Sequence, residues 1–195
     1  MKQTEITVQV FNSLEDIDLL LKNKGFILNK KVVLKDYYFT RFGKEKVKNM
    51  NYKELLESSI LLRNLTGDVN ETELIFKNKL FDKNGNVIEE EKFKTKVDSM
   101  ESSLKILKCA KLYNWCNLTQ NLFIYKKDEK ELCVQDVDGL GIFIEYEEDP
   151  SYKNLKADEK IILMINYLKD LNLILGEDFF CKKVYMKYSN KNLKK

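Results

Sequence analysis

Alternation of apolar and polar residues is the clearest pattern in this chain, and it predicts strands. In residues 4–11, Ile6, Val8 and Val10 fall on one side of an extended chain, with polar residues between them. Because successive side chains of a strand point to opposite faces, we expect this segment to bury one face only. Further strands are expected at 58–65, 72–81, 87–97, 116–127, 131–137 and 141–147, and a hairpin or strand pair at 26–42.

Three segments have the spacing of amphipathic helices instead. Ser13 is expected to cap the first of them, which ends at Gly25. The second begins near Asp98 with a sequence typical of a capping box. The third, residues 157–172, carries apolar residues at helical intervals, which we interpret as core packing. This order of about eight strands and three helices predicts an α+β fold.

Charged residues share faces in two of the predicted strands: Glu145 and Glu147 in one, and Glu73, Lys77 and Lys79 in the other. On an open sheet these faces would meet water. The helices, however, need apolar sheet faces to cover. If they cover the outside of a closed barrel, the charged residues line its interior. We therefore predict an antiparallel β-barrel with a charged interior and helices packed outside.

The 195 residues include only 7 glycines and 1 proline, and no composition shift marks a linker. We expect one domain over residues 1–188 and a disordered, Lys-rich tail at 189–195. No stretch is long and apolar enough to cross a membrane, and the first residues lack the apolar run of a signal peptide. The expected location is therefore the cytoplasm.

Composition excludes several kinds of chemistry. Charged residues make up 33% of the chain, but the net charge is only +3, so a nucleic-acid partner is not favoured. There are 0 histidines, which rules out Ser-His and Cys-His nucleophiles. The 4 cysteines lack the spacing of a zinc site, and no glycine-rich phosphate loop is present. Catalysis would have to use carboxylates, lysines, tyrosines or a bound hard cation.

The order of several short motifs resembles the CYTH domain, the fold shared by class IV adenylyl cyclases, thiamine triphosphatases and inorganic triphosphatases. The strongest match is the segment GLGIFIEYE at 139–147, which is similar to the family's LGxFxExE strand. DYYF at 36–39 is similar to its DxYF, and Glu5 begins its ExExK strand. Arg63 matches the second arginine of LRxR, and Lys77 matches the lysine of the next strand. The resemblance covers roughly residues 4–188.

The resemblance implies an eight-stranded closed barrel around a tunnel that binds a triphosphate or polyphosphate small molecule. Basic residues on its wall would grip the phosphates, and glutamates would hold Mg²⁺ or Mn²⁺ against them. Cations in a poorly hydrated interior bind an anion more strongly than surface lysines do. The residues that this assigns to phosphate are Arg63, Lys77, Lys126, Lys127 and Lys183. Those that it assigns to the metal are Glu5, Glu145 and Glu147.

Several positions depart from the family pattern. The largest departure is a reversal of charge in the RxExE strand, and other family charges are replaced by neutral or opposite side chains. The residues at these positions are Thr7, Gln9, Leu61, Glu90, Lys92, Lys94, Asp128 and Gln135. A slip of one residue would place Asp136 where Gln135 is aligned.

Two functions from different classes therefore stay open. The first is a metal-dependent enzyme that hydrolyses a triphosphate or, less favoured because no adenine-binding set is recognisable, cyclises ATP. The second is a catalytically inactive module that binds a phosphorylated small molecule in a tunnel that has kept its cations. A weaker third interpretation is a channel that binds RNA ends, whose affinity would depend on salt.

Overall fold

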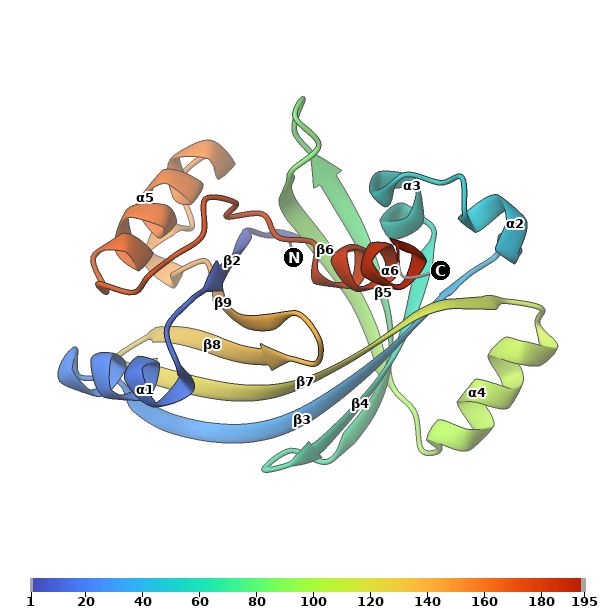
Figure 1. The fold of residues 1–195 in the computed structure, drawn as a ribbon, viewed down its shortest axis with the longest axis horizontal. Coiled ribbons are helices and arrows are strands. Elements are labelled where there is room, and N and C mark those ends of the chain that lie inside the picture. The colour runs from blue at the N-terminus through green and yellow to red at the C-terminus, as the bar shows by residue number, and fades with distance from the viewer. Residues whose placement is uncertain (1, 194–195) are drawn as a thin grey trace.

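The computed structural model describes residues 2–193 and shows one curled antiparallel sheet flanked by helices (Figure 1). The strands lie side by side in the order β1-β6-β5-β4-β3-β7-β8-β9-β2. Their bounds are β1 Lys2–Gln3, β2 Glu5–Val10, β3 Ile27–Thr40, β4 Ser59–Gly67, β5 Glu71–Phe81, β6 Val87–Lys96, β7 Tyr113–Lys127, β8 Lys130–Val137 and β9 Gly141–Glu147. The α+β class and seven of the predicted strand ranges are confirmed within three residues.

The sheet is open, so the prediction of a closed barrel is wrong. β1 pairs with β6 through only two residues, Lys2 and Gln3, and the sheet ends there. The reason lies at the outer edge of β2, which the chain's own C-terminal segment occupies. The amide of Thr7 donates to the carbonyl of Phe179 at 3.0 Å, and the amide of Gly176 donates to the carbonyl of Gln9 at 2.8 Å. With these partners, the Thr7 amide and the Gln9 carbonyl are not available to β6.

One unbroken strand, β3, replaces the hairpin or strand pair predicted at 26–42. It pairs along most of its length with β4 on one side and with β7 on the other. The segment contains no glycine or proline that would turn the chain, and β-branched and aromatic residues keep it extended. β3 is therefore a central strand that carries residues of the concave face through the middle of the sheet.

The two faces of the sheet follow the alternation of the sequence. The convex face is apolar where helices cover it, and the concave face carries a cluster of charged residues. On β2, for example, Ile6 and Val8 are buried in the outer core, whereas Glu5 and Thr7 line the interior. Helices α1 (Leu14–Asn23) and α5 (Ala157–Lys169) pack over the convex face of β2, β8 and β9. α4 (Met100–Cys109) covers β3 and β4 at the other end (Figure 1).

The predicted helices form, and their ends follow local chemistry. The Ser13 side chain accepts a hydrogen bond from the amide of Asp16 at 3.1 Å, which caps α1. Gly25 follows α1 with φ +85°, a conformation that glycine adopts without strain. In α5, Met164 and Leu168, two of the apolar residues expected at helical spacing, are fully buried.

Three helices were not predicted: α2 (Lys44–Val47), α3 (Tyr52–Glu57) and α6 (Lys183–Leu193). α6 packs against β7, where the ring of Tyr188 meets that of Trp115 edge-on at 5.4 Å between centroids. The helix continues into the tail expected to be disordered, and residues 189–193 are helical. Residues 194–195 lie outside the described residues. Across residues 2–193, no helix combines the length and apolarity needed to span a membrane.

Candidate functional site

The concave face of the sheet encloses a cavity of about 200 Å³. Every strand from β2 to β9 contributes at least one residue to its wall, and residues 180–184, which lead into α6, cover one side. Charged side chains from six different strands are thereby brought together. The charged interior predicted from the sequence is confirmed, although the sheet around it is open.

Three carboxylates meet at one side of this cavity. Glu5 on β2 lies opposite Glu147 on β9, and Glu145 lies two residues earlier on the same strand. One carboxylate oxygen from each of the three residues lies within 4.8 Å of the others. Burial, and next the nearby charge of Glu145, raise the pKa of Glu5. Mg²⁺ and Mn²⁺ prefer oxygen ligands of this kind, so the set fits a hard divalent cation.

Lys92 of β6 extends its ammonium group into this carboxylate cluster. Its Nζ lies 2.8 Å from an Oε of Glu147 and 3.2 Å from an Oε of Glu5. It also lies 3.2 Å from an Oε of Glu90 on its own strand. The charge reversal recognised in the sequence therefore places a lysine among the candidate metal ligands.

Arg63 and Asp36 form a fixed pair on the opposite wall. They face each other on β4 and β3, and the guanidinium donates from Nε and from a terminal nitrogen to the two carboxylate oxygens, both at 2.8 Å. Asp36 is only 1% exposed. Burial lowers the pKa of Arg63, but the carboxylate outweighs burial and raises it overall. The pair therefore holds a permanent cation at the cavity wall.

Glu90 is shared by two lysines of β5. Its two carboxylate oxygens accept hydrogen bonds from Lys77 and Lys79, each at 2.8 Å. Burial raises the pKa of Glu90, but the ammonium groups of Lys77 and Lys79 outweigh this effect and lower it. Glu90 stays ionised and fixes both lysines on the inner face. Lys77 is thus in the cavity, as the sequence predicted, and Lys79 and Glu90 join it.

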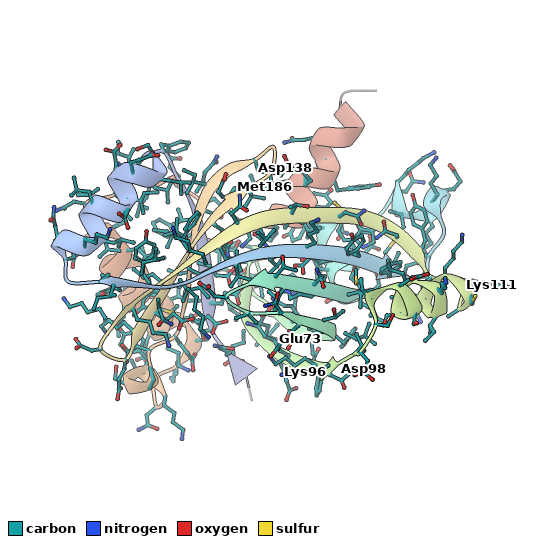
Figure 2. All side chains as sticks on the ribbon, turned by 90° about the horizontal axis from the view of Figure 1, so that it is seen from below. Glu73, Lys96, Asp98, Lys111, Asp138 and Met186 are labelled. Atoms are coloured by element: carbon teal, nitrogen blue, oxygen red, sulfur yellow. The ribbon has the colours of Figure 1, made fainter. Side chains whose placement is uncertain are left out.

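Lys183, at the start of α6, reaches across to the carboxylate cluster. Its ammonium donates to an Oε of Glu145 at 2.8 Å and to the amide oxygen of Gln135. Burial raises the pKa of Glu145, but Lys183 and Lys77 outweigh it and lower the pKa to about 2. The turn after β8 supports this end of α6, where Asp138 lies beside Met186 (Figure 2) and pairs with the next residue of the helix.

Lys126 and Lys127 do not line the cavity. Lys126 pairs with Glu131 at 3.1 Å, and both side chains are half exposed. Lys127 donates to the carbonyl of Lys24 at 2.8 Å, beside the end of α1. Both lie at the far end of β7, beyond the wall that holds the charged residues, so their assignment to phosphate has no support in their position. Lys94 likewise turns away and pairs at 3.0 Å with Glu73, which lies near Lys96 (Figure 2).

A neutral polar group lies unsatisfied in the wall between the charges. Gln120 of β7 is 4% exposed, and its Oε1 has no hydrogen-bond partner among the described residues. Its neighbours on the inner face of the same strand are Leu118 and Leu122, which also line the cavity. Because a buried unpaired amide is costly, Gln120 is a group that a bound ligand or water would complete.

The ionised groups of the cavity balance one another. Its ion pairs join five cationic side chains to five carboxylates. The cations are Arg63, Lys77, Lys79, Lys92 and Lys183, and the carboxylates are Glu5, Asp36, Glu90, Glu145 and Glu147. The net charge of this set is therefore zero.

Sequence reasoning placed Lys79 on the inner face with Lys77 but did not assign it to phosphate, and it treated Glu90, Lys92 and Gln135 only as departures from a family pattern. The alternation of residues 72–81 already put Lys79 on the face of Lys77. The same alternation put Glu90 and Lys92 on one face of the next strand. The charges on this face are exchanged relative to the family pattern, and they still pair with charges of other strands. That signal was present, but it needed the pairing of the two strands to be recognised.

The curled antiparallel sheet, its helices and its charged concave face define the class as an α+β protein with a tunnel-like fold whose sheet is open. Solved structures share this fold. A Pyrococcus horikoshii protein, 14% identical, has a TM-score of 0.70 and matches 97% of this chain and 99% of its own. A protein of Vibrio parahaemolyticus named a "putative adenylate cyclase", 14% identical, has a TM-score of 0.67 and matches 96% of this chain and 97% of its own.

The Hippeastrum protein described as a "putative adenylyl cyclase" with "a dominant triphosphatase activity" also shares the fold. It is 11% identical, with a TM-score of 0.58 over 97% of this chain and 96% of its own. In sequence, the chain is 27% identical over 186 residues to a "putative adenylate cyclase" of Methanocaldococcus jannaschii, a match that spans 95% of this chain and 97% of that protein. No family model matches the chain. These likenesses confirm the resemblance to the CYTH superfamily that the strand motifs indicated.

Proposed function

We propose that this protein binds a triphosphate or polyphosphate compound together with a divalent cation inside the cavity, and that it hydrolyses the compound. The observation that carries the proposal is the meeting of Glu5, Glu145 and Glu147 within 4.8 Å in a cavity whose other walls hold Arg63 and Lys77. Carboxylates and cations in one enclosed space suit a metal and a phosphate chain at once. The names of the Hippeastrum and Methanocaldococcus proteins point to the same substrates.

The charge balance supports a metal complex rather than a bare anion. A triphosphate carries about four negative charges near neutral pH. Added alone to a cavity whose ion-paired groups sum to zero, it would leave those charges uncompensated in a poorly hydrated space. Two divalent cations would cancel them. The metal ions would take the place of the lysines as partners of the carboxylates. The lysines would then be free to bind phosphate oxygens.

The chain's own residues supply the positioning that phosphoryl transfer needs. Arg63, held by Asp36, presents a guanidinium that keeps its charge at any physiological pH. Lys77 and Lys79 offer ammonium groups from the neighbouring strand. The bound cation would polarise the phosphate and neutralise charge that develops in the transition state. A histidine is not required, because such a reaction depends mainly on orientation and charge neutralisation.

Binding without turnover is the second candidate, and one observation favours it. Lys92 lies among the carboxylates, and Gln135 lies beside Glu145, at positions where the family pattern has carboxylates. A cavity that has exchanged acids for a lysine and an amide keeps its affinity for phosphate and offers a metal fewer ligands. Such a protein would sense or sequester a phosphorylated small molecule.

Product analysis separates these candidates. The purified chain is incubated with tripolyphosphate, thiamine triphosphate or ATP, each with Mg²⁺ and with Mn²⁺, and phosphate, pyrophosphate and cyclic AMP are quantified. Hydrolysis that needs the metal, and that Glu145→Gln and Arg63→Met abolish, supports the proposal. The control is Lys105→Met, which breaks an exposed pair with Glu101 on α4, far from the cavity. Cyclic AMP as the main product would identify a cyclase instead.

The binding candidate is tested in the same samples by thermal melting. A rise in melting temperature with tripolyphosphate, without any product, would favour the binding module. Neither product nor a melting shift with any of the compounds would contradict both candidates. Turnover that is unchanged in both Glu145→Gln and Arg63→Met would show that the reaction takes place elsewhere.

A further inference from the structure

Lys92 is the residue of the cavity whose contacts the proposed function leaves unexplained. Its ammonium is held by three carboxylates that come from three different strands: Glu147 of β9 at 2.8 Å, Glu5 of β2 at 3.2 Å and Glu90 of β6 at 3.2 Å. Two of these three, Glu5 and Glu147, are also members of the candidate metal set. The lysine and a metal ion therefore compete for the same oxygens.

The two cations cannot share this position. A divalent ion that binds Glu5 and Glu147 would lie a few ångströms from the Lys92 ammonium, and like charges at such a distance repel strongly in a poorly hydrated site. A free metal ion would thus have to displace an ammonium that already neutralises the carboxylates. The lysine is attached to the chain, so it is present at a high local concentration that dilution does not lower.

A phosphate chain changes this competition because it gives the ammonium another partner. The lysine side chain has four flexible carbons and a compact charge, so it can turn from a carboxylate to a phosphate oxygen without movement of the strand. Lys92 is 26% exposed in its side chain, and its neighbours toward the cavity, Lys77 and Lys79, already line the phosphate wall. Binding of the phosphate chain would then free the carboxylates for the metal, and binding of the metal would free the ammonium for the phosphate chain.

We propose that Lys92 acts as a tethered cation that occupies the carboxylate site, and that a divalent metal enters this site only together with a polyphosphate anion, which draws the ammonium away. This inference rests on the proposed metal and phosphate site and adds that the two ligands bind there together. Metal and anion bind cooperatively, and by linkage each raises the affinity for the other by the same factor. The protein thereby discriminates the metal complex of a polyphosphate from free metal and from free anion.

A structural role is the competing explanation for Lys92. The ammonium links β6 to β2 and β9 across the opening of the sheet, where the backbones are paired only through Lys2 and Gln3. If the lysine served only to hold this opening together, its loss would lower stability and would leave metal affinity unchanged or reduced. Metal affinity in the absence of phosphate therefore separates the two roles.

The first experiment titrates Mn²⁺ alone into the intact protein and measures free Mn²⁺ by electron paramagnetic resonance. Lys92→Met keeps the length of the side chain and removes the charge, whereas Lys92→Arg keeps the charge. We expect Lys92→Met to bind Mn²⁺ at least about tenfold more tightly than the wild type and Lys92→Arg to stay weak. Lys92→Gln is measured as well, in case the methionine variant fails to fold, and Lys105→Met is the matched surface control.

The second experiment measures the affinity of the wild type for imidotriphosphate, a tripolyphosphate analogue with hydrolysis-resistant bridges, by calorimetry with EDTA or with Mn²⁺. We expect Mn²⁺ to tighten binding of the analogue at least about tenfold in the wild type. Mn²⁺ binding to the folded Lys92→Met and Lys92→Gln variants that is no tighter than to the wild type would overturn the proposal. So would equal affinity for the analogue with and without Mn²⁺.

Failure of the proposed function gives a different result. If the wild type binds the analogue under neither condition, the cavity is not a polyphosphate site. The titrations with Mn²⁺ alone would still decide whether Lys92 excludes metal from the carboxylates.

Discussion

Asp36→Asn removes one charge from the buried pair that fixes Arg63 and changes almost no volume. In the wild type, two charge-assisted hydrogen bonds of 2.8 Å join Arg63 to Asp36, and the carboxylate is 1% exposed. The amide of asparagine can accept one of these bonds and leaves the guanidinium without a counter-charge. Since Arg63 retains its charge at all accessible pH values, the variant cannot relax by losing a proton.

The expected loss follows from these contacts. Breaking a buried ion pair by removing one partner costs about 3–5 kcal/mol. The side chain of Arg63 is 24% exposed, so water can solvate part of the guanidinium, and the cost should fall at the lower end. We therefore expect Asp36→Asn to lower the free energy of unfolding by about 3 kcal/mol. Urea denaturation followed by circular dichroism measures this value.

A double variant separates stability from binding. In Asp36→Leu with Arg63→Met both charges are gone, and Leu34 and Leu118 lie beside the new apolar side chains on the concave face. Replacing a buried pair by apolar residues is often neutral, so we expect stability within about 1 kcal/mol of the wild type. Affinity for imidotriphosphate with Mn²⁺ should fall at least about tenfold, because the fixed cation is lost.

Two results would refute this reasoning. A loss below about 1 kcal/mol in Asp36→Asn would show that the pair is solvated and does not hold Arg63 in place. A double variant that is stable and binds the analogue as the wild type does would show that Arg63 is not a phosphate ligand.

Three further predictions follow from other contacts. The folded-state pKa of Glu145, about 2, lies below its ordinary value of 4.5, so its pairing with Lys183 stabilises the fold fully above that ordinary value and is lost as pH falls toward 2. The melting temperature should therefore fall less steeply with decreasing pH in Glu145→Gln than in the wild type between these pH values. Equal slopes would contradict the pairing. Ser59→Ala removes the acceptor of the buried Trp115 indole N–H, 2.9 Å away, and should cost about 1–3 kcal/mol in denaturation followed by tryptophan fluorescence. Lys126→Met should leave both the affinity for imidotriphosphate and the stability within about 0.5 kcal/mol of the wild type, and a clear loss of affinity would restore this lysine to the phosphate site.

The strands could be predicted from the sequence because each needs only its own alternation. Ile6 and Val8 point outward and Glu5 inward, as their spacing requires. Closure of the barrel could not be predicted, because it depends on which backbone takes the outer edge of β2. That edge is taken by the segment around Phe179, whose sequence shows no regular strand pattern.

The site was predictable where a residue acts through its place on a strand, as Glu145 and Lys77 do. Lys183 was assigned by resemblance and lies in the cavity, although it comes from a helix that periodicity did not indicate. Lys126 and Lys127 lie outside the cavity wall, because resemblance aligns residues but does not show where a long strand leaves that wall. The contacts of Lys92 needed three strands to be assembled, and no local pattern contains that information.

The arrangement of β2 also has a consequence for how the chain folds during synthesis. Thr7 pairs with Glu145 on one side and meets Phe180 on the other, so both partners of the first long strand are made late. Until then, Ile6 and Val8 lack the core that they occupy in the finished protein. Contacts between such distant parts of a chain form slowly, and the exposed apolar strand is open to wrong pairing in the meantime. A nascent chain that has not yet released β9 from the ribosome therefore cannot pair its own first strand as the folded protein does.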